Sequence, residues 1–255
     1  MRRLAAALLA AAALLGPAAR AEGGRRTVSV AAASSLEPAL ADLAAAFERE
    51  EPRARVSATY GASGALFARI RAAEPFDAFL SADRDFPRRL VEGRLGGPEV
   101  IYAVGRLVVW SPPGSPILLG RTGLRALASP GVRRIAVANP AVAPHGRAAT
   151  AALQAADVLP SVQGRLVLGD CDARAADLAV AGGADAAILP GSLVRRPPLS
   201  SGTTVPVPPE LHPRLVHSAV VLARAREPAL ARAFLDFVAG RRGREILRRH
   251  GYELP

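Results

Sequence analysis

Two patterns of apolar residues alternate along the chain. Short β-branched runs predict buried strands, and longer runs with apolar residues three or four positions apart predict amphipathic helices. This alternation is typical of an α/β protein with largely parallel sheets. The expected strands are Thr27–Ala31, Arg55–Thr59, Ala78–Ser81, Leu107–Trp110, Arg134–Ala138, Arg165–Leu168, Ala186–Leu189 and Leu215–Ala223. The expected helices are Glu37–Glu50, Ala65–Ala73, Arg84–Glu92, Ala148–Ala156, Ala173–Ala181 and Pro228–Arg249.

Two longer apolar runs, Val100–Trp110 and Leu215–Ala223, show no clear alternation and are predicted to pass between two lobes. Two crossings place both chain ends in the same lobe. The Pro- and Gly-rich stretches Ser111–Ser115 and Arg195–Pro209 are predicted to be surface connections within one lobe. The expected division is residues 22–106 with 217–255 for lobe 1, and residues 107–216 for lobe 2.

The first 21 residues have the pattern of a cleaved secretory signal peptide. Arg2 and Arg3 precede an apolar run over Leu4–Leu15, and an A-x-A cleavage site ends at Ala21. The apolar run is too short to span a bilayer, which needs about 20 residues. The sequence therefore predicts export to the periplasm.

The composition excludes several classes of chemistry. All 33 basic residues are Arg, so lysine-dependent phosphate loops and Schiff bases are excluded. The single Cys171 forms no internal disulfide, and the four histidines lack zinc-site spacing. Half of the residues are hydrophobic, which favours a well-buried core.

The segment after residue 21 has 30 arginines against 22 acidic residues, a net charge of +8. Its arginines are dispersed along the sequence, and only 4% of the full chain is aromatic. We expect no cofactor and no nucleic-acid partner.

Four small or polar clusters lie where an expected strand or loop gives way to a helix. A helix N-terminus has unpaired N–H groups and a partial positive charge, and small residues let an anion approach the backbone. Four such helix starts around one cleft would form an oxyanion pocket. The clusters are Ala33-Ser34-Ser35-Leu36, Gly61-Ala62-Ser63-Gly64, Pro144-His145-Gly146-Arg147 and Asp170-Cys171-Asp172.

Each cluster also has an ordinary structural interpretation, because Ser and Asp are preferred helix N-caps in any protein. A hydrolase built from Ser35 or Ser63 with His145 and Asp172 is a further alternative. The sequence around Ser63 lacks the last glycine of the Gly-x-Ser-x-Gly elbow, which disfavours that enzyme class.

Eight segments in this order and spacing resemble those of the periplasmic molybdate-binding proteins that serve ABC transporters. The resemblance covers nearly the whole chain after the signal peptide. The segments are Val30–Leu36, Tyr60–Gly64, Phe76–Asp83, Arg134–Pro140 with Ala143–Arg147, Gly183–Ala187, Ala233–Phe237 and His250–Pro255.

The resemblance implies a type II periplasmic binding protein fold: two lobes, each a mostly parallel sheet flanked by helices, joined by two hinge crossovers. It also implies that the lobes close on a tetrahedral dianion held by hydroxyl and backbone N–H groups. Carried over by position, the oxyanion ligands are the Ser35 and Ser63 hydroxyls, the His145 backbone and the helix start at Asp172, with Ser34 as the alternative first serine.

Two positions refine this expectation. Many relatives place a Tyr near position 190, where this chain has Pro190, so the resemblance is to the branch that lacks that Tyr. Because a carboxylate repels a dianion, the Asp172 side chain is expected to cap its helix while only its N–H faces the cleft.

The predicted function is therefore high-affinity periplasmic binding of molybdate, and of tungstate, by a monomer that delivers it to an ABC transporter permease. No side chain is expected to coordinate a metal directly, and no catalysis is expected. Another tetrahedral oxyanion, sulfate or phosphate, is the nearest alternative, and the exported Ser hydrolase is a more distant one.

Overall fold

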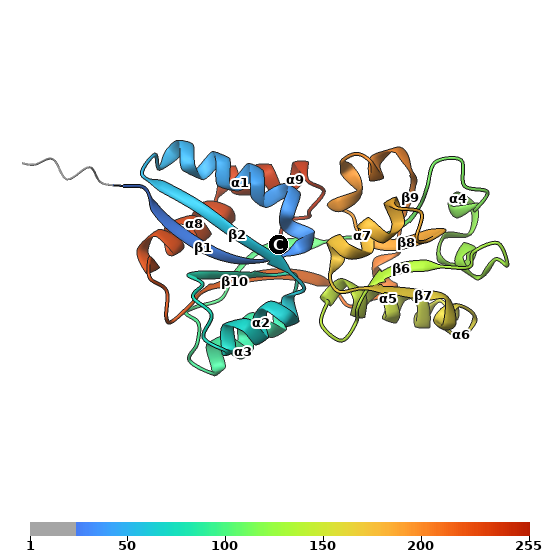
Figure 1. Ribbon diagram of the computed structural model, residues 1–255, viewed down its shortest axis with the longest axis horizontal. Coiled ribbons are helices and arrows are strands. Elements are labelled where there is room, and N and C mark those ends of the chain that lie inside the picture. Colours follow the sequence, from blue (N-terminus) through green and yellow to red (C-terminus); the bar gives the residue numbers. More distant parts are fainter. Residues whose placement is uncertain (1–23) are drawn as a thin grey trace, which may run out of the picture.

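The computed structural model describes residues 24–255, so the predicted signal peptide lies outside the described residues. Ten strands form two five-stranded sheets that lie side by side (Figure 1). The first sheet has the order β2-β1-β3-β10-β4 and contains β1 Arg26–Ala33, β2 Ala54–Gly61, β3 Ala78–Ser81, β4 Val100–Gly105 and β10 Leu215–Val221. The second has the order β7-β6-β8-β5-β9 and contains β5 Leu107–Ser111, β6 Ile135–Ala138, β7 Leu166–Gly169, β8 Ala186–Pro190 and β9 Thr203–Pro206.

Helices cover both faces of each sheet, so each lobe has three layers. The first lobe carries α1 Glu37–Glu50, α2 Ser63–Arg71, α3 Asp85–Glu92, α8 Pro228–Ala239 and α9 Arg241–Arg249. The second carries α4 Leu119–Thr122, α5 Pro144–Ala155, α6 Leu159–Val162 and α7 Asp172–Val180. Short 3-10 helices are η1 Ser34–Leu36, η2 Gly123–Ala128, η3 Gln163–Arg165, η4 Leu193–Arg195, η5 Leu199–Ser201 and η6 Pro209–Leu211. None of the described helices is long and apolar enough to cross a membrane.

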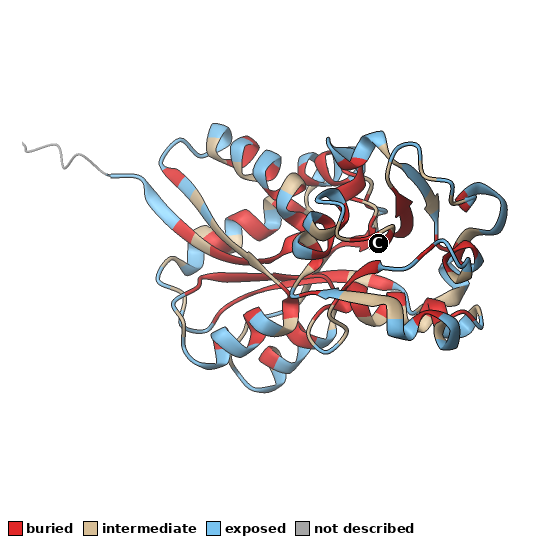
Figure 2. Ribbon diagram, turned by 45° about the vertical axis from the view of Figure 1, so that its right-hand side comes forward, coloured by how far each residue is buried: buried red, intermediate tan, exposed pale blue. Residues whose placement is uncertain are grey.

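The apolar spacing explains how the helices attach to the sheets. In α1, Leu40, Leu43 and Phe47 lie on one stripe and pack with α8 and α9 against one face of the first sheet. In α2, Leu66 and Phe67 pack with α3 against the other face. Figure 2 shows the same division, with buried strands inside and exposed helix surfaces outside.

The two-lobed α/β fold is confirmed, but the sheets are mixed. Strands β1, β2 and β3 pair in parallel, as do β6, β7 and β8, whereas β10 and β5 pair antiparallel with their neighbours. The antiparallel pairs lie at the two passages between the lobes: β4 and β5 border the first passage, β9 and β10 border the second, and β10 pairs with β4 and β5 with β9.

The crossovers lie near the expected apolar runs. The predicted run over residues 100–110 is two strands, separated by Arg106, that belong to different sheets. The return passage lies between Pro206 and Leu215, and β10 pairs with β4 from Leu215 onward. The expected lobe boundaries at residues 106/107 and 216/217 stay a prediction.

Two expectations about individual elements were wrong. The helix expected over Pro228–Arg249 is broken at Gly240, which has an extended backbone and separates α8 from α9. The stretch Arg195–Pro209, expected to be a surface connection, contains the edge strand β9, which pairs with β5. Residues 203–206 form a strand because they pair with the edge of β5, which comes from a distant part of the chain.

Candidate functional site

The parallel strands bring the predicted helix starts together in pairs. Strand β1 leads into η1 and β2 into α2, and their last residues, Ala33 and Gly61, lie side by side in the sheet. In the second lobe Ala138 of β6 pairs with Gly169 of β7, and the loops that follow lead into α5 and α7. The carboxyl edge of parallel strands is where open α/β folds place ligands.

Contacts between the lobes bring the two pairs face to face. The N–H of Ala173 in α7 donates a 3.3 Å hydrogen bond to the Ser34 hydroxyl, and the N–H of Gly64 in α2 donates a 2.9 Å bond to the Val142 carbonyl. A small apolar cluster joins the residues that precede three of the helix starts, Ala62, Ala143 and Cys171. All four sequence clusters therefore meet between the lobes.

These helix starts carry no side-chain caps. The residues in the N-cap positions of η1, α2, α5 and α7 are Ala33, Ala62, Ala143 and Cys171, and none makes a capping hydrogen bond. Ser63 and Asp172 are instead the first residues of their helices. The capping interpretation of the serines does not describe this structure. The interlobe bonds use the first-turn N–H groups of Gly64 and Ala173, and those of His145 and Asp172 remain available for a ligand.

The serines are fully buried, and their hydroxyls differ in how they are bonded. The Ser35 hydroxyl has no hydrogen-bond partner within the described residues. The Ser63 hydroxyl accepts a 3.1 Å bond from the Ala82 N–H, which leaves its own hydrogen free to donate. The Ser34 hydroxyl likewise accepts a bond, from the Ala173 N–H, and keeps its own hydrogen to donate, so Ser34 remains the alternative to Ser35.

His145 and Asp172 are also buried, and they contact each other directly. The His145 Nδ1 atom lies 3.1 Å from Asp172 Oδ2, while His145 Nε2 and Asp172 Oδ1 have no partner among residues 24–255. The expectation that Asp172 caps its own helix was therefore wrong. Its carboxylate orients the imidazole of α5 because the α5 and α7 starts lie side by side, which the sequence alone did not indicate.

This geometry bears on the hydrolase alternative. A triad needs a nucleophile hydrogen-bonded to the base. Asp172 orients His145, but in the described part of the chain neither the Ser35 nor the Ser63 hydroxyl is bonded to that imidazole. The structure brings together the base and the carboxylate of a triad but not the contact between the base and a serine nucleophile.

Sequence reasoning missed two side chains that support Ser35. The hydroxyls of Tyr252 and Ser192 each donate a 2.8 Å hydrogen bond to the Ser35 carbonyl. Tyr252 is buried, which raises its pKa, and its hydroxyl also reaches Ser192 at 3.2 Å. Tyr252 lies in the C-terminal segment that carries the family resemblance, and Ser192 follows Pro190 by two residues.

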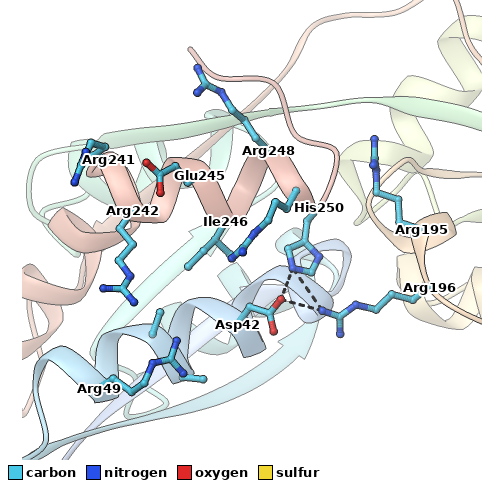
Figure 3. Close-up of a pocket in the computed structure, with 13 residues that line it drawn as sticks. Asp42, Arg49, Arg195, Arg196, Arg241, Arg242, Glu245, Ile246, Arg248 and His250 are labelled. Atoms are coloured by element: carbon cyan, nitrogen blue, oxygen red, sulfur yellow. Dashed lines mark hydrogen bonds and ion pairs between the residues drawn. The ribbon is translucent and has the colours of Figure 1, made fainter.

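A large open cavity lies away from the candidate site. It has a volume of about 1120 Å³ and lies between α1, α9 and residues 195–196, and none of the four candidate residues lines it (Figure 3). Among residues 24–255, no group of three or more His, Cys, Asp or Glu side chains is arranged to hold a metal ion.

Comparison with known proteins assigns the family. The family model for bacterial extracellular solute-binding proteins matches residues 28–253. A molybdate-binding protein of Rhodobacter capsulatus is 32% identical over 88% of this chain and 87% of its own, and one of Azotobacter vinelandii is 30% identical over 89% and 90%. The solved structure of an Azotobacter vinelandii periplasmic molybdate-binding protein superposes with a TM-score of 0.83 at 29% identity, covering 89% of this chain and 99% of that one. The chain belongs to the bacterial extracellular solute-binding protein family, in the group that contains these molybdate-binding proteins.

Proposed function

We propose that this protein binds molybdate, and tungstate in the same way, in the periplasm and delivers it to an ABC transporter permease. The observation that carries the proposal is the meeting of four uncapped helix starts, two from each lobe, around buried hydroxyls. The names of the similar proteins support the same ligand. The protein is proposed to act without catalysis, as a monomer, and without nucleic acid.

The proposed ligands are the hydroxyls of Ser35 and Ser63 and the backbone N–H groups of His145 and Asp172. All of them contact the oxygens of the ligand, so no bond between protein and metal is needed. A hydrogen bond to a charged group contributes about 1.5–3 kcal/mol. Several such bonds in a closed, desolvated cleft offset the cost of removing a dianion from water.

One observation favours a second candidate, phosphate. Monohydrogen phosphate carries a proton that needs an acceptor, and Asp172 Oδ1 is a buried acceptor with no partner in the described structure. Sulfate and molybdate carry no such proton at neutral pH. The comparison of these ligands is therefore the decisive measurement.

Isothermal titration calorimetry of the protein, freed of bound anion, tests the proposal against molybdate, tungstate, sulfate and phosphate. We expect sub-micromolar binding of the two larger oxyanions and at least a hundredfold weaker binding of the two smaller ones. Tight binding of phosphate would show that phosphate, and not molybdate, is the ligand. Hydrolysis of a model ester, lost in Ser35→Ala or Ser63→Ala, would instead favour the hydrolase.

A further inference from the structure

The described part of the chain contains five buried side-chain polar atoms without a hydrogen-bond partner. One is the Ser111 hydroxyl on β5, and the other four are Ser35 Oγ, His145 Nε2, Asp172 Oδ1 and His217 Nε2. Buried polar atoms are almost always bonded, so each exception calls for a physical reason. The Ser35 and Asp172 atoms belong to the proposed anion site, whereas His217 on β10 has so far no role.

Hydrogen bonds fix which nitrogen of each imidazole carries hydrogen. A carboxylate only accepts, so His145 Nδ1 donates to Asp172. The Tyr102 hydroxyl donates its single hydrogen to the Ser81 carbonyl at 2.8 Å, and therefore it accepts from His217 Nδ1, 3.4 Å away. When the rings are neutral, both Nε2 atoms are thus bare lone pairs.

The two lone pairs are directed at the same small space. His145 belongs to α5 of the second lobe and His217 to β10 of the first, and their ring centroids are 5.6 Å apart. A Cβ atom on Gly105 would lie 2.7 Å from His217 Nε2 and 3.2 Å from His145 Nε2. Gly105 ends β4 at the crossover, so the absence of a side chain there makes room for both imidazoles.

The groups that face this pair are Asp172 from α7, Tyr102 from β4 and Tyr252 after α9. Burial raises the pKa of both tyrosines, which keeps them neutral. Burial also lowers the pKa of His217 well below its ordinary value, and a positive charge on His145 lowers it further. A second positive charge on the pair is therefore disfavoured. Among residues 24–255, the anionic side chain in contact with the pair is Asp172.

Charge balance connects the pair to the ligand. A dianion at the start of α7 comes close to the buried Asp172 carboxylate, and like charges in a desolvated site repel strongly. No Arg side chain within residues 24–255 forms an ion pair with Asp172; its one ion-pair partner there is His145. One proton taken from solvent by an imidazole nitrogen offsets the carboxylate charge and gives one of the two lone pairs a hydrogen.

We propose that the His145–His217 pair takes up one proton when the oxyanion binds, which makes His217 a further residue that determines affinity. The inference rests on the proposed function and deepens it. Protonation of either Nε2 supplies the donor that the other lacks, so the proton also joins the two lobes beside the crossover. Linkage requires that a ligand which favours proton binding is itself bound more tightly when protons are abundant.

Calorimetry in buffers of different ionisation enthalpy, such as MOPS, HEPES and Tris at one pH, measures the protons taken up per molybdate. Between pH 8.5 and 6.5 we expect uptake approaching one proton and an affinity that rises by up to tenfold per unit decrease in pH. In His217→Gln the uptake falls to near zero and the affinity becomes nearly independent of pH. The matched control is His212→Gln, which changes a histidine outside the site and retains both wild-type properties.

The outcomes separate this inference from the proposed function. Wild-type protein that binds molybdate with no proton uptake at any pH overturns the inference and leaves the function standing. Wild-type protein that binds no tetrahedral oxyanion overturns the function itself. The wild-type measurement needs no variant, so misfolding of His217→Gln leaves the inference testable.

Discussion

At the scale of single residues, burial and hydrogen-bond satisfaction distinguish side chains that share one predicted role. Ser35 and Ser63 are equally buried, but only Ser63 has a protein partner, the Ala82 N–H. A hydroxyl without a protein partner contributes little to the stability of the fold and is free to bind a ligand. A hydroxyl that accepts a backbone N–H stabilises the fold and can still donate its hydrogen to a ligand.

The two serines should therefore respond differently to substitution by alanine. Both variants should lose about 1.5–3 kcal/mol of molybdate affinity, measured by calorimetry, because each loses one donor to the anion. Only Ser63→Ala should also lose about 1–3 kcal/mol in the free energy of unfolding, measured with urea, because a buried N–H is left unpaired. Ser111→Ala removes another unpartnered buried hydroxyl and should leave affinity unchanged. Wild-type affinity in both site variants would contradict the assignment.

At the scale of elements, close approach between neighbouring segments determines which residues fit at several positions. Gly243 lies in the first turn of α9, where a Cβ atom would come within 2.3 Å of the carbonyl oxygens of Phe237 and Val238 at the end of α8. The break at Gly240 and the packing at Gly243 together let α9 fold back on α8. Apolar spacing does not distinguish this arrangement from one continuous helix.

Gly243→Ala should therefore destabilise the first lobe. Overpacking of a close contact typically costs about 1–3 kcal/mol, so we expect a lower thermal unfolding midpoint and little change in molybdate affinity measured below it. Gly164→Ala is the matched control, because no atom lies within 4 Å of the Cβ position there. Equal midpoints for the two variants would show that α9 moves to accommodate the methyl group.

A second element-scale feature joins α1, the end of α9 and the segment after η4. Asp42 lies 2.7 Å from His250 Nε2 and 3.2 Å from an Arg196 nitrogen, at one side of the arginine-lined cavity (Figure 3). The hydrogen bond from His250 lowers the pKa of Asp42, with smaller effects from nearby positive charges. The contact therefore links the two lobes through a partly exposed carboxylate.

This pKa shift predicts the sign of a pH effect. A carboxyl group with a lowered pKa in the folded state stabilises the protein fully above its unfolded value, near 3.9, and loses that contribution as the pH falls through the folded value. Asp42→Asn should remove this part of the acid dependence when urea unfolding is followed below pH 4. Because Asp42 is half exposed, the effect should be small and weakened by salt. Arg174 and Asp177 form an exposed pair within α7, and Asp177→Asn is the control.

At the scale of the whole molecule, the two lobes are in contact across the site. The bonds from Ala173 to Ser34, from Gly64 to Val142 and from Ser192 to Ser35 all cross from one lobe to the other. An anion between the helix starts is enclosed by this arrangement, so entry requires these bonds to open. We expect the lobes to rotate about the two crossovers, at Arg106 and after Pro206.

Small-angle X-ray scattering should therefore detect closure. We expect a smaller radius of gyration with saturating molybdate than without it, since the ligand stabilises contacts that the open form lacks. Sulfate at the same concentration is the control and should leave the profile unchanged. Superimposable profiles with and without molybdate, in protein shown by calorimetry to bind it, would contradict a hinged mechanism.

Most of the elements, and the positions of the candidate site, could be predicted from local sequence. Local spacing of apolar residues is a property of each segment, so α1 and the strand leading into Ser34 were predictable, and the small residues at four helix starts indicated an anion. The same residues carried the resemblance to the family.

Which atoms of those residues lack a hydrogen-bond partner depends on how distant segments are brought together in the fold. The contact between His145 and Asp172, the support of Ser35 by Tyr252, and the meeting of His145 with His217 each join residues far apart in the chain. The strand β9 and the break before α9 depend in the same way on neighbours supplied by other segments. Hydrogen-bond partners and close contacts arise only when the lobes are assembled, and periodicity along the chain does not encode them.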